Sequence, residues 1–204
     1  MLNLIEVTIL YQLLAGISPL FFLFYQKREG LNILFTHLFC SFLCTLMIFI
    51  THFYRLENLV FFNSYIFSAS VLLPLMYFKS VEKKFSKYLI LIVFMINLTL
   101  LISELIKTDF LVISLVSENI LEITLCLLFY FDFLLSNELS SSKKLFFWIN
   151  TSFFIYNCFS FLFNLYITEI MDSHLWFIHN IVEGSSKLFI TLSIWKFSKK
   201  IISS

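Results

Sequence analysis

The sequence predicts an all-α fold: a polytopic membrane protein whose seven-transmembrane-helix bundle has its N-terminus outside and its C-terminus in the cytoplasm (N-out/C-in). Three observations predict it, namely the composition, the spacing of the apolar runs and the placement of the basic residues. Of the 204 residues, 60% are hydrophobic and 13% are charged, whereas about a quarter of the residues in a soluble domain are charged. The bilayer is therefore the expected solvent, and residues 1–204 are expected to form a single transmembrane domain.

Apolar runs of the length of a membrane span fill most of the chain. A helix needs about 20 residues to cross the hydrocarbon core. Seven runs of about this length lie at 4–25, 31–54, 58–78, 88–106, 110–134, 145–168 and 175–195. The first run carries Glu6 where a secretory signal would carry basic residues, so we expect it to remain as a helix. The short breaks between runs make consecutive helices antiparallel neighbours.

Basic residues are concentrated on one side of this arrangement. The first, third and fifth breaks and the C-terminal tail hold eleven of them: Lys27, Arg28, Lys79, Lys83, Lys84, Lys87, Lys143, Lys144, Lys196, Lys199 and Lys200. The other breaks hold two, Arg55 and Lys107. Because cytoplasmic loops retain Lys and Arg, this asymmetry predicts the N-out/C-in orientation. The net charge of +1, with no long charged run, gives no reason to expect a nucleic-acid partner.

Ionisable residues inside the predicted spans identify a candidate site. Glu118 and Glu122 lie one turn apart in 110–134, and Glu183 and Lys187 lie one turn apart in 175–195. At a rise of 1.5 Å per residue, each pair falls about 12 to 18 Å below the outer end of its helix, and Asn157 in 145–168 reaches a similar depth. Such groups face the interior of a bundle and are functional candidates by default. We therefore predict a polar site near mid-membrane, with Ser70 and Asn97 at similar depths.

Two interpretations of this polar site remain open. In the first, Lys187 pairs with Glu183 or Glu122 only to neutralise buried charge and to fix helix register. In the second, the site binds a ligand, a cation or a proton, because three carboxylates face a single ammonium group. No catalytic residue is assigned in either case, and an enzyme is not expected.

Two other patterns suggest binding chemistry and are given less weight. His37, Cys40 and Cys44 share one face of 31–54 and could bind a soft metal, but no fourth ligand matches them in depth, so core packing is favoured and no metal site is predicted. The stretch from Glu183 to Lys187 resembles the Asp-x-x-x-Lys stretch of microbial rhodopsins, whose lysine carries retinal. The run 58–78 lacks the Asp and Arg of that family's proton pathway, so no cofactor is expected.

The whole chain resembles a family of small seven-helix membrane proteins of Bacteroidota, often encoded beside sensor histidine kinases. The resemblance is carried by Phe-Trp-Ile-Asn-Thr-Ser-Phe-Phe-Ile-Tyr-Asn at 147–157 and by His-Asn-Ile-Val-Glu at 179–183. It implies a bacterial inner-membrane protein and a histidine kinase or other effector as partner.

The leading functional expectation is a membrane sensor or signalling subunit that acts through such a partner. Basic residues that would face the partner or anionic lipid are Lys83, Lys84, Lys143, Lys144, Lys199 and Lys200. The alternative is a pore or carrier that uses the polar site, with a homo-oligomer supplying the conduit that one thin bundle lacks.

Overall fold

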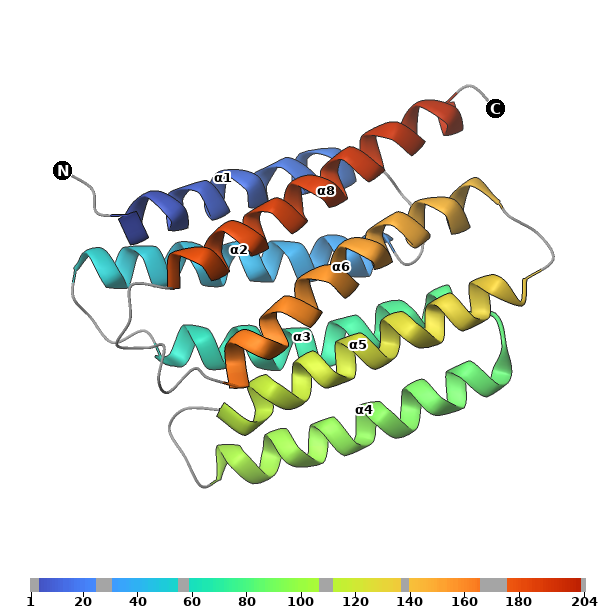
Figure 1. Cartoon of the computed structure of the whole chain (residues 1–204), viewed down its shortest axis with the longest axis horizontal. Helices are drawn as coiled ribbons and strands as arrows, with labels where there is room; N and C mark the ends of the chain where they lie inside the picture. Colours follow the sequence, from blue (N-terminus) through green and yellow to red (C-terminus); the bar gives the residue numbers. More distant parts are fainter. Residues whose placement is uncertain are drawn as a thin grey trace.

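The computed structural model contains helices and no strands in the residues that it describes, which are 4–24, 31–54, 59–106, 112–136, 140–165 and 176–202. They form seven helices (Figure 1). These are α1 (Leu4–Phe24), α2 (Leu31–Phe53), α3 (Leu59–Ser80), α4 (Lys84–Leu105), α5 (Val112–Leu134), α6 (Ser141–Leu165) and α8 (Trp176–Ile202). The all-α prediction is confirmed, and each predicted run corresponds to one helix.

The predicted boundaries were wrong mainly at lysine-rich helix ends. Helix α4 begins at Lys84 instead of 88, α6 begins at Ser141 instead of 145, and α8 continues to Ile202 instead of ending at 195. An apolar run marks the part of a helix that suits lipid, whereas lysine is a good helix former that extends the same helix into a polar environment. The helices are therefore longer than their apolar segments.

Six of the helices form a ring. Neighbouring helices contact each other in the order α1, α2, α3, α5, α6, α8 and back to α1, while α4 packs outside the ring against α3 and α5. The buried residues of α4 share one face: Ser86, Ile90, Asn97, Leu101 and Glu104. Consecutive helices are neighbours as predicted, and the contact between α1 and α8 closes the ring.

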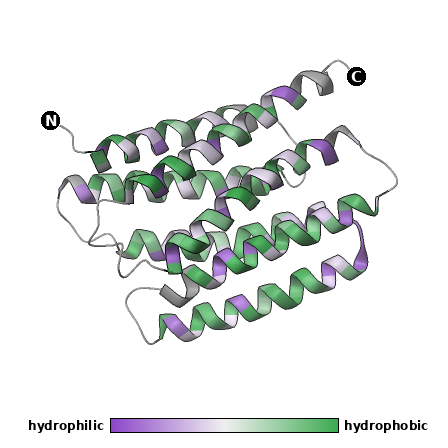
Figure 2. Ribbon diagram, in the orientation of Figure 1, coloured by the Kyte–Doolittle hydropathy of each residue, from purple (hydrophilic) through white to green (hydrophobic). Residues whose placement is uncertain are grey.

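Hydrophobic residues predominate along the helices (Figure 2), and many large apolar side chains are exposed on the outside of the bundle, as lipid would require. Within the described residues, four helical segments are long and apolar enough to cross a membrane: Leu31–His52, Val60–Ser80, Lys84–Leu105 and Lys143–Leu165. A shorter apolar segment, Glu6–Phe21, lies in α1. Helices α5 and α8 carry charged residues within their length, but their exposed large side chains include Ile120, Leu127, Phe131, Leu188 and Leu192.

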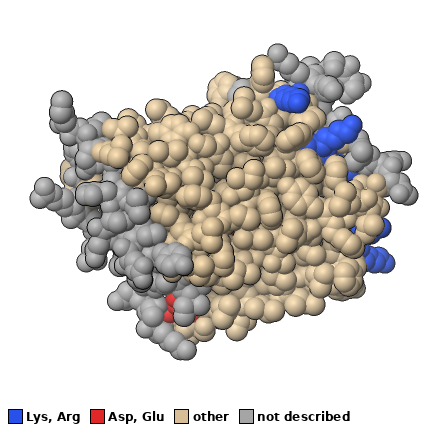
Figure 3. All heavy atoms as spheres, in the orientation of Figure 1, with Lys and Arg blue, Asp and Glu red and all other residues tan. Residues whose placement is uncertain are grey.

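One end of the bundle is basic and is filled by an apolar core. The α3–α4 connection, the start of α6 and the end of α8 lie at this end, and the blue spheres in Figure 3 gather there. The main core cluster draws on the same parts of the helices, with Leu73 and Met76 of α3, Leu145 and Ile149 of α6, and Ile194 of α8. We call this half of the bundle the basic half and the other half the distal half.

Two polar contacts fasten the α3–α4 connection in the basic half. The buried carboxylate of Asp132, in α5, accepts hydrogen bonds from the backbone N–H groups of Glu82 (3.2 Å) and Lys83 (2.9 Å). Lys143 Nζ lies 2.7 Å from Glu82 Oε2. Because the connection is held to α5 and α6 at once, α4 starts at a fixed position beside the ring.

Helices α1 and α8 pack closely along their lengths. An added Cβ at Gly184 would lie 2.5 Å from Tyr11 Cε1, and Tyr11 Oη is 3.1 Å from Ser185 Oγ. Ser18 Oγ and Thr191 Oγ1 are 2.7 Å apart further along the same contact. A small residue and paired hydroxyl groups let two helices approach in an apolar solvent, where burial of apolar surface gives little drive for association.

Candidate functional site

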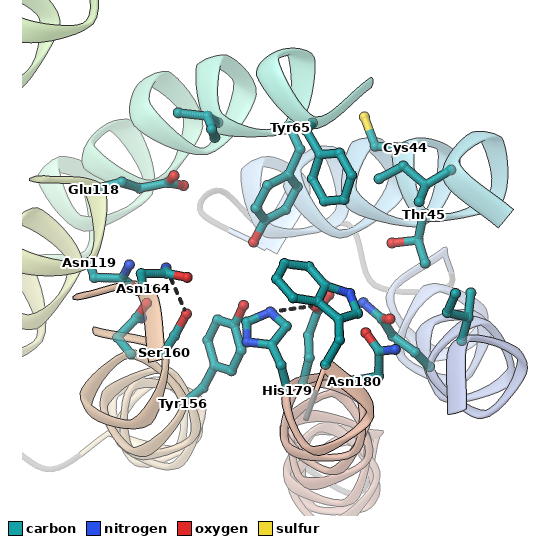
Figure 4. A pocket seen from close by; sticks show the side chains of 18 of the residues that line it. Cys44, Thr45, Tyr65, Glu118, Asn119, Tyr156, Ser160, Asn164, His179 and Asn180 are labelled. Atoms are coloured by element: carbon teal, nitrogen blue, oxygen red, sulfur yellow. Dashed lines mark hydrogen bonds and ion pairs between the residues drawn. The ribbon is translucent and has the colours of Figure 1, made fainter. Parts of the chain in front are cut away.

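A cavity of about 90 Å³ lies inside the ring, in the distal half. All six ring helices line it, and α4 does not. The polar lining side chains are Gln12, Cys44, Thr45, Tyr65, Glu118, Asn119, Glu122, Tyr156, Asn157, Ser160, Asn164, Trp176, His179, Asn180 and Glu183. By volume it has room for about six to nine waters, or for one small organic molecule. Figure 4 shows the lining side chains converging from the surrounding helices.

Helix α5 contributes two buried carboxyl groups to one wall of the cavity. Glu118 and Glu122 are both 4% exposed and lie one helical turn apart. The amide nitrogen of Asn157, in α6, donates a hydrogen bond to Glu122 Oε2 and a second one to the backbone oxygen of Phe153 at 2.9 Å. Glu118 Oε1 is buried and has no hydrogen-bond partner among the residues that the structure describes.

Helix α8 contributes the third carboxyl group, which is already paired. Lys187 Nζ lies 2.6 Å from Glu183 Oε1, and His179 Nε2 lies 3.8 Å from Glu183 Oε2. Lys187 does not line the main cavity. It lines a smaller one of about 20 Å³ on the side of the basic half, together with His37 and Ser41. Glu183 lines both cavities, as do Tyr65 and Tyr156.

Aromatic side chains form much of the remaining wall. Phe62 and Tyr65 reach the cavity from α3, Tyr156 from α6 and Trp176 from α8. The Trp176 ring packs against Phe62, with centroids 6.2 Å apart, and against His179, with centroids 5.4 Å apart. The cavity therefore combines carboxyl groups with aromatic faces.

The structure brings together four of the five predicted site residues, since Glu118, Glu122, Asn157 and Glu183 all line the main cavity. Lys187 joins them only through its ion pair with Glu183. Ser70 and Asn97 are buried but lie outside the lining, and Asn97 Oδ1 accepts a hydrogen bond from Ser117 Oγ at 3.0 Å. The predicted site residues therefore meet at one cavity in the distal half, and Lys187 is linked to this cavity through its ion pair with Glu183.

The possible soft-metal ligands of α2, His37, Cys40 and Cys44, do not form one metal-binding group. Cys44 lines the main cavity, whereas His37 lines the smaller one. Within the described ranges, no group of three or more His, Cys, Asp or Glu side chains is placed to hold a metal ion.

The basic residues predicted to face a partner fall into three groups. Lys83, Lys84 and Lys144 are exposed at the end of the basic half. Lys143 is only partly exposed, and its charge is paired with Glu82. The side chains of Lys199 and Lys200 lie outside the part of the chain that the structure describes.

The aromatic wall and two buried ionisable groups were not predicted as parts of this arrangement. No role in the site was predicted for Tyr65, Tyr156 or Trp176, because aromatic residues are common throughout the chain. His179 lines the cavity beside Glu183. Glu104 is 6% exposed within the face of α4 that packs on the ring. The four-residue spacing of His179 and Glu183 was a signal that the two share one helix face.

Comparison with known proteins gave no match: no family model, no curated protein and no solved structure is significantly similar to this chain.

Proposed function

We propose that this protein is an integral membrane sensor or signalling subunit of the bacterial inner membrane, which binds a small ligand in the distal half of a seven-span bundle. One observation carries the proposal: a cavity with three carboxyl groups is lined by six helices, and the basic half below it is filled by the apolar core. A ligand there would touch every helix of the ring, so its binding can shift the packing of all of them.

The proposal of seven membrane spans is supported by the faces of the three remaining helices, α1, α5 and α8. Helices α1, α5 and α8 have 21, 23 and 27 residues, and about 20 residues cross the hydrocarbon core. Their charged side chains at mid-length, Glu118, Glu122, Glu183 and Lys187, are buried inside the bundle. Their outward faces are apolar, so no charge at these positions meets lipid.

The basic half is proposed to face the cytoplasm. Among the described lysines other than Lys187, all occur near helix ends at this half: Lys79, Lys83, Lys84, Lys87, Lys143, Lys144, Lys196, Lys199 and Lys200. Cytoplasmic ends retain basic residues. The N-out/C-in orientation places the cavity toward the outside, where a ligand would be met, and places exposed Lys83, Lys84 and Lys144 toward a cytoplasmic partner.

The partner is proposed to be a histidine kinase or another effector with an acidic surface. A kinase is the partner suggested by the resemblance to the Bacteroidota family, and acidic character would complement the lysines that remain unpaired at this end. Anionic lipid can satisfy the same charges, each by about 1 kcal/mol, so the surface by itself does not distinguish the two.

A pore or carrier is the competing function, favoured by the carboxyl groups of the cavity. Cation pathways are often lined by acidic side chains. The apolar core of the basic half opposes it, because Leu73, Ile149 and Ile194 are at most 1% exposed and fill the path that ions would need. We therefore favour a ligand-binding sensor over a pore or carrier as the function of this protein.

The test compares partner contact with ion flux in the same variants. A photo-crosslinking residue at position 144 is expected to capture one defined effector in cells, and reversing two exposed charges with Lys83→Glu and Lys84→Glu is expected to abolish that crosslink. The purified chain in liposomes is expected to conduct K⁺ no faster than empty liposomes. Flux that is lost in Glu118→Gln, together with no effector crosslink, would overturn the sensor in favour of the pore.

A further inference from the structure

The main cavity has an excess of acidic groups. It is lined by Glu118, Glu122 and Glu183, and only Glu183 has a cation in contact, the Lys187 ammonium group at 2.6 Å. Among the described side chains, no Lys or Arg forms an ion pair with Glu118 or Glu122. Buried carboxylates are rarely left without a cation or a proton, because the uncompensated charge is costly in a medium of low dielectric constant.

Glu118 is placed to accept a hydrogen bond that the described chain does not supply. The residue is only 4% exposed, and its Oε1 atom has no hydrogen-bond partner among the described residues. Glu122 differs, because Asn157 already donates to it. Figure 4 shows the Glu118 carboxyl group extending from α5 into the space that Tyr65 enters from α3. The Glu118 side chain therefore lines the cavity, and its unpartnered Oε1 atom is buried in the cavity wall.

Aromatic side chains line the cavity together with the carboxyl groups, which favours an organic cation over a metal ion. Phe62, Tyr65, Tyr156 and Trp176 all line it. The face of an aromatic ring attracts an ammonium group and also packs against its carbon atoms, with the strongest attraction at tryptophan. Ring faces are not ligands for an inorganic cation, which needs oxygen ligands, and the test below therefore compares the organic probe with K⁺.

We propose that the ligand is a small organic ammonium ion with at least one N–H group, the size of a short alkylamine or a monocyclic arylalkylamine. Its N–H donates to Glu118, its charge is shared by Glu118 and Glu122, and its carbon skeleton packs on the rings of Tyr65, Tyr156 and Trp176. The proposal rests on the ligand-binding sensor described above and names the class of its ligand.

The test uses benzylammonium as the probe and benzyl alcohol, its neutral analogue of similar shape, as the control. Thermal unfolding of the purified full chain in nanodiscs is followed by tryptophan fluorescence as each compound is titrated. Benzylammonium is expected to raise the unfolding midpoint with increasing concentration, because a ligand that binds only the folded state stabilises it. Benzyl alcohol and K⁺ at equal concentration are expected to leave the midpoint unchanged.

Variants then locate the site. Glu118→Gln is expected to weaken benzylammonium binding at least tenfold, while Glu104→Gln, a buried glutamate outside the cavity, leaves it unchanged. If Glu118→Gln does not fold, Tyr65→Leu is expected to weaken binding and Tyr65→Phe, which keeps the ring face, to retain it.

Equal stabilisation by benzyl alcohol, equal stabilisation by K⁺, or none by benzylammonium would overturn the ammonium proposal. This assay contains no partner, so its failure is separate from that of the sensor. If benzylammonium does not bind but the effector crosslink is intact, the ammonium proposal is wrong and the sensor proposal stands. Binding without any effector crosslink supports the ligand class and removes the signalling role.

Discussion

At the scale of single residues, the ion pair between Lys187 and Glu183 neutralises two charges that are buried inside the bundle. Both side chains are buried, and their charged atoms are 2.6 Å apart. Such a pair contributes little net stability compared with apolar residues of the same size, but removal of one partner leaves an uncompensated buried charge. This asymmetry makes the pair testable.

Lys187→Ala is expected to lower the free energy of unfolding by about 3 to 5 kcal/mol, because Glu183 loses its cation. Adding Glu183→Gln should recover part of this loss. Glu122→Gln is the matched control and should recover none, because Lys187 pairs with Glu183, whereas Glu122 accepts its hydrogen bond from Asn157. Denaturant titrations in mixed micelles measure all three. Equal recovery by the two Gln variants would mean that Lys187 compensates the whole cavity instead of one glutamate.

The residue scale is also where prediction from sequence was least complete. The charged residues were found, because a charge inside an apolar run is conspicuous and is costly unless it faces the interior. The aromatic wall was not found, since Tyr65, Tyr156 and Trp176 have the residue types that also pack cores and face lipid in this chain. Only the relative rotation of α3, α6 and α8 distinguishes these roles, and the sequence of one chain does not contain that rotation.

At the scale of helices, the contact between α1 and α8 closes the ring around the cavity. Gly184 is the point of closest approach, since an added Cβ there would lie 2.5 Å from Tyr11 Cε1. Gly16 lies on the same helix pair but has space, with Phe42 Cδ2 as its nearest neighbour at 3.5 Å. The two glycines form a matched pair for substitution.

Gly184→Ala is expected to destabilise the protein by about 1 to 3 kcal/mol, because the Tyr11 ring must move. Gly16→Ala should be neutral or stabilising by up to about 1 kcal/mol, since alanine favours the helix and meets no clash. Adding Tyr11→Ala to Gly184→Ala should remove the steric part of the penalty. Equal effects of the two glycine substitutions, measured by unfolding in mixed micelles, would show that the α1–α8 contact is looser than described.

The helices themselves were the most predictable level. Their existence follows from apolar runs of spanning length, and their order around most of the ring follows from short connections between neighbours. The closure of α1 on α8 and the exclusion of α4 from the ring were not predictable, because they depend on which faces pack. The contacts that close the ring are made by Gly184, Ser18 and Thr191. Residues of these types also occur on helix faces that pack against nothing, so the sequence does not predict the contact.

At the scale of the whole molecule, the two halves of the bundle have different structures and different proposed roles. The distal half holds a polar cavity that can take up a small ligand, and the basic half holds an apolar core with exposed lysines at its end. Because the same helices build both halves, a change of packing around the cavity can reach the basic end without a separate hinge. This account requires the basic end to lie in the cytoplasm.

The most direct test is the location of the C-terminus. Two fusions after Ser204 should be compared in a bacterial host: alkaline phosphatase, which folds only outside the cytoplasm, and a fluorescent protein that folds only inside it. With seven spans and eleven basic residues on one side, only the fluorescent fusion should be active. An active phosphatase fusion with a dark fluorescent fusion would contradict the topology, and with it the assignment of the cavity to the outer side and of the lysines to a cytoplasmic partner.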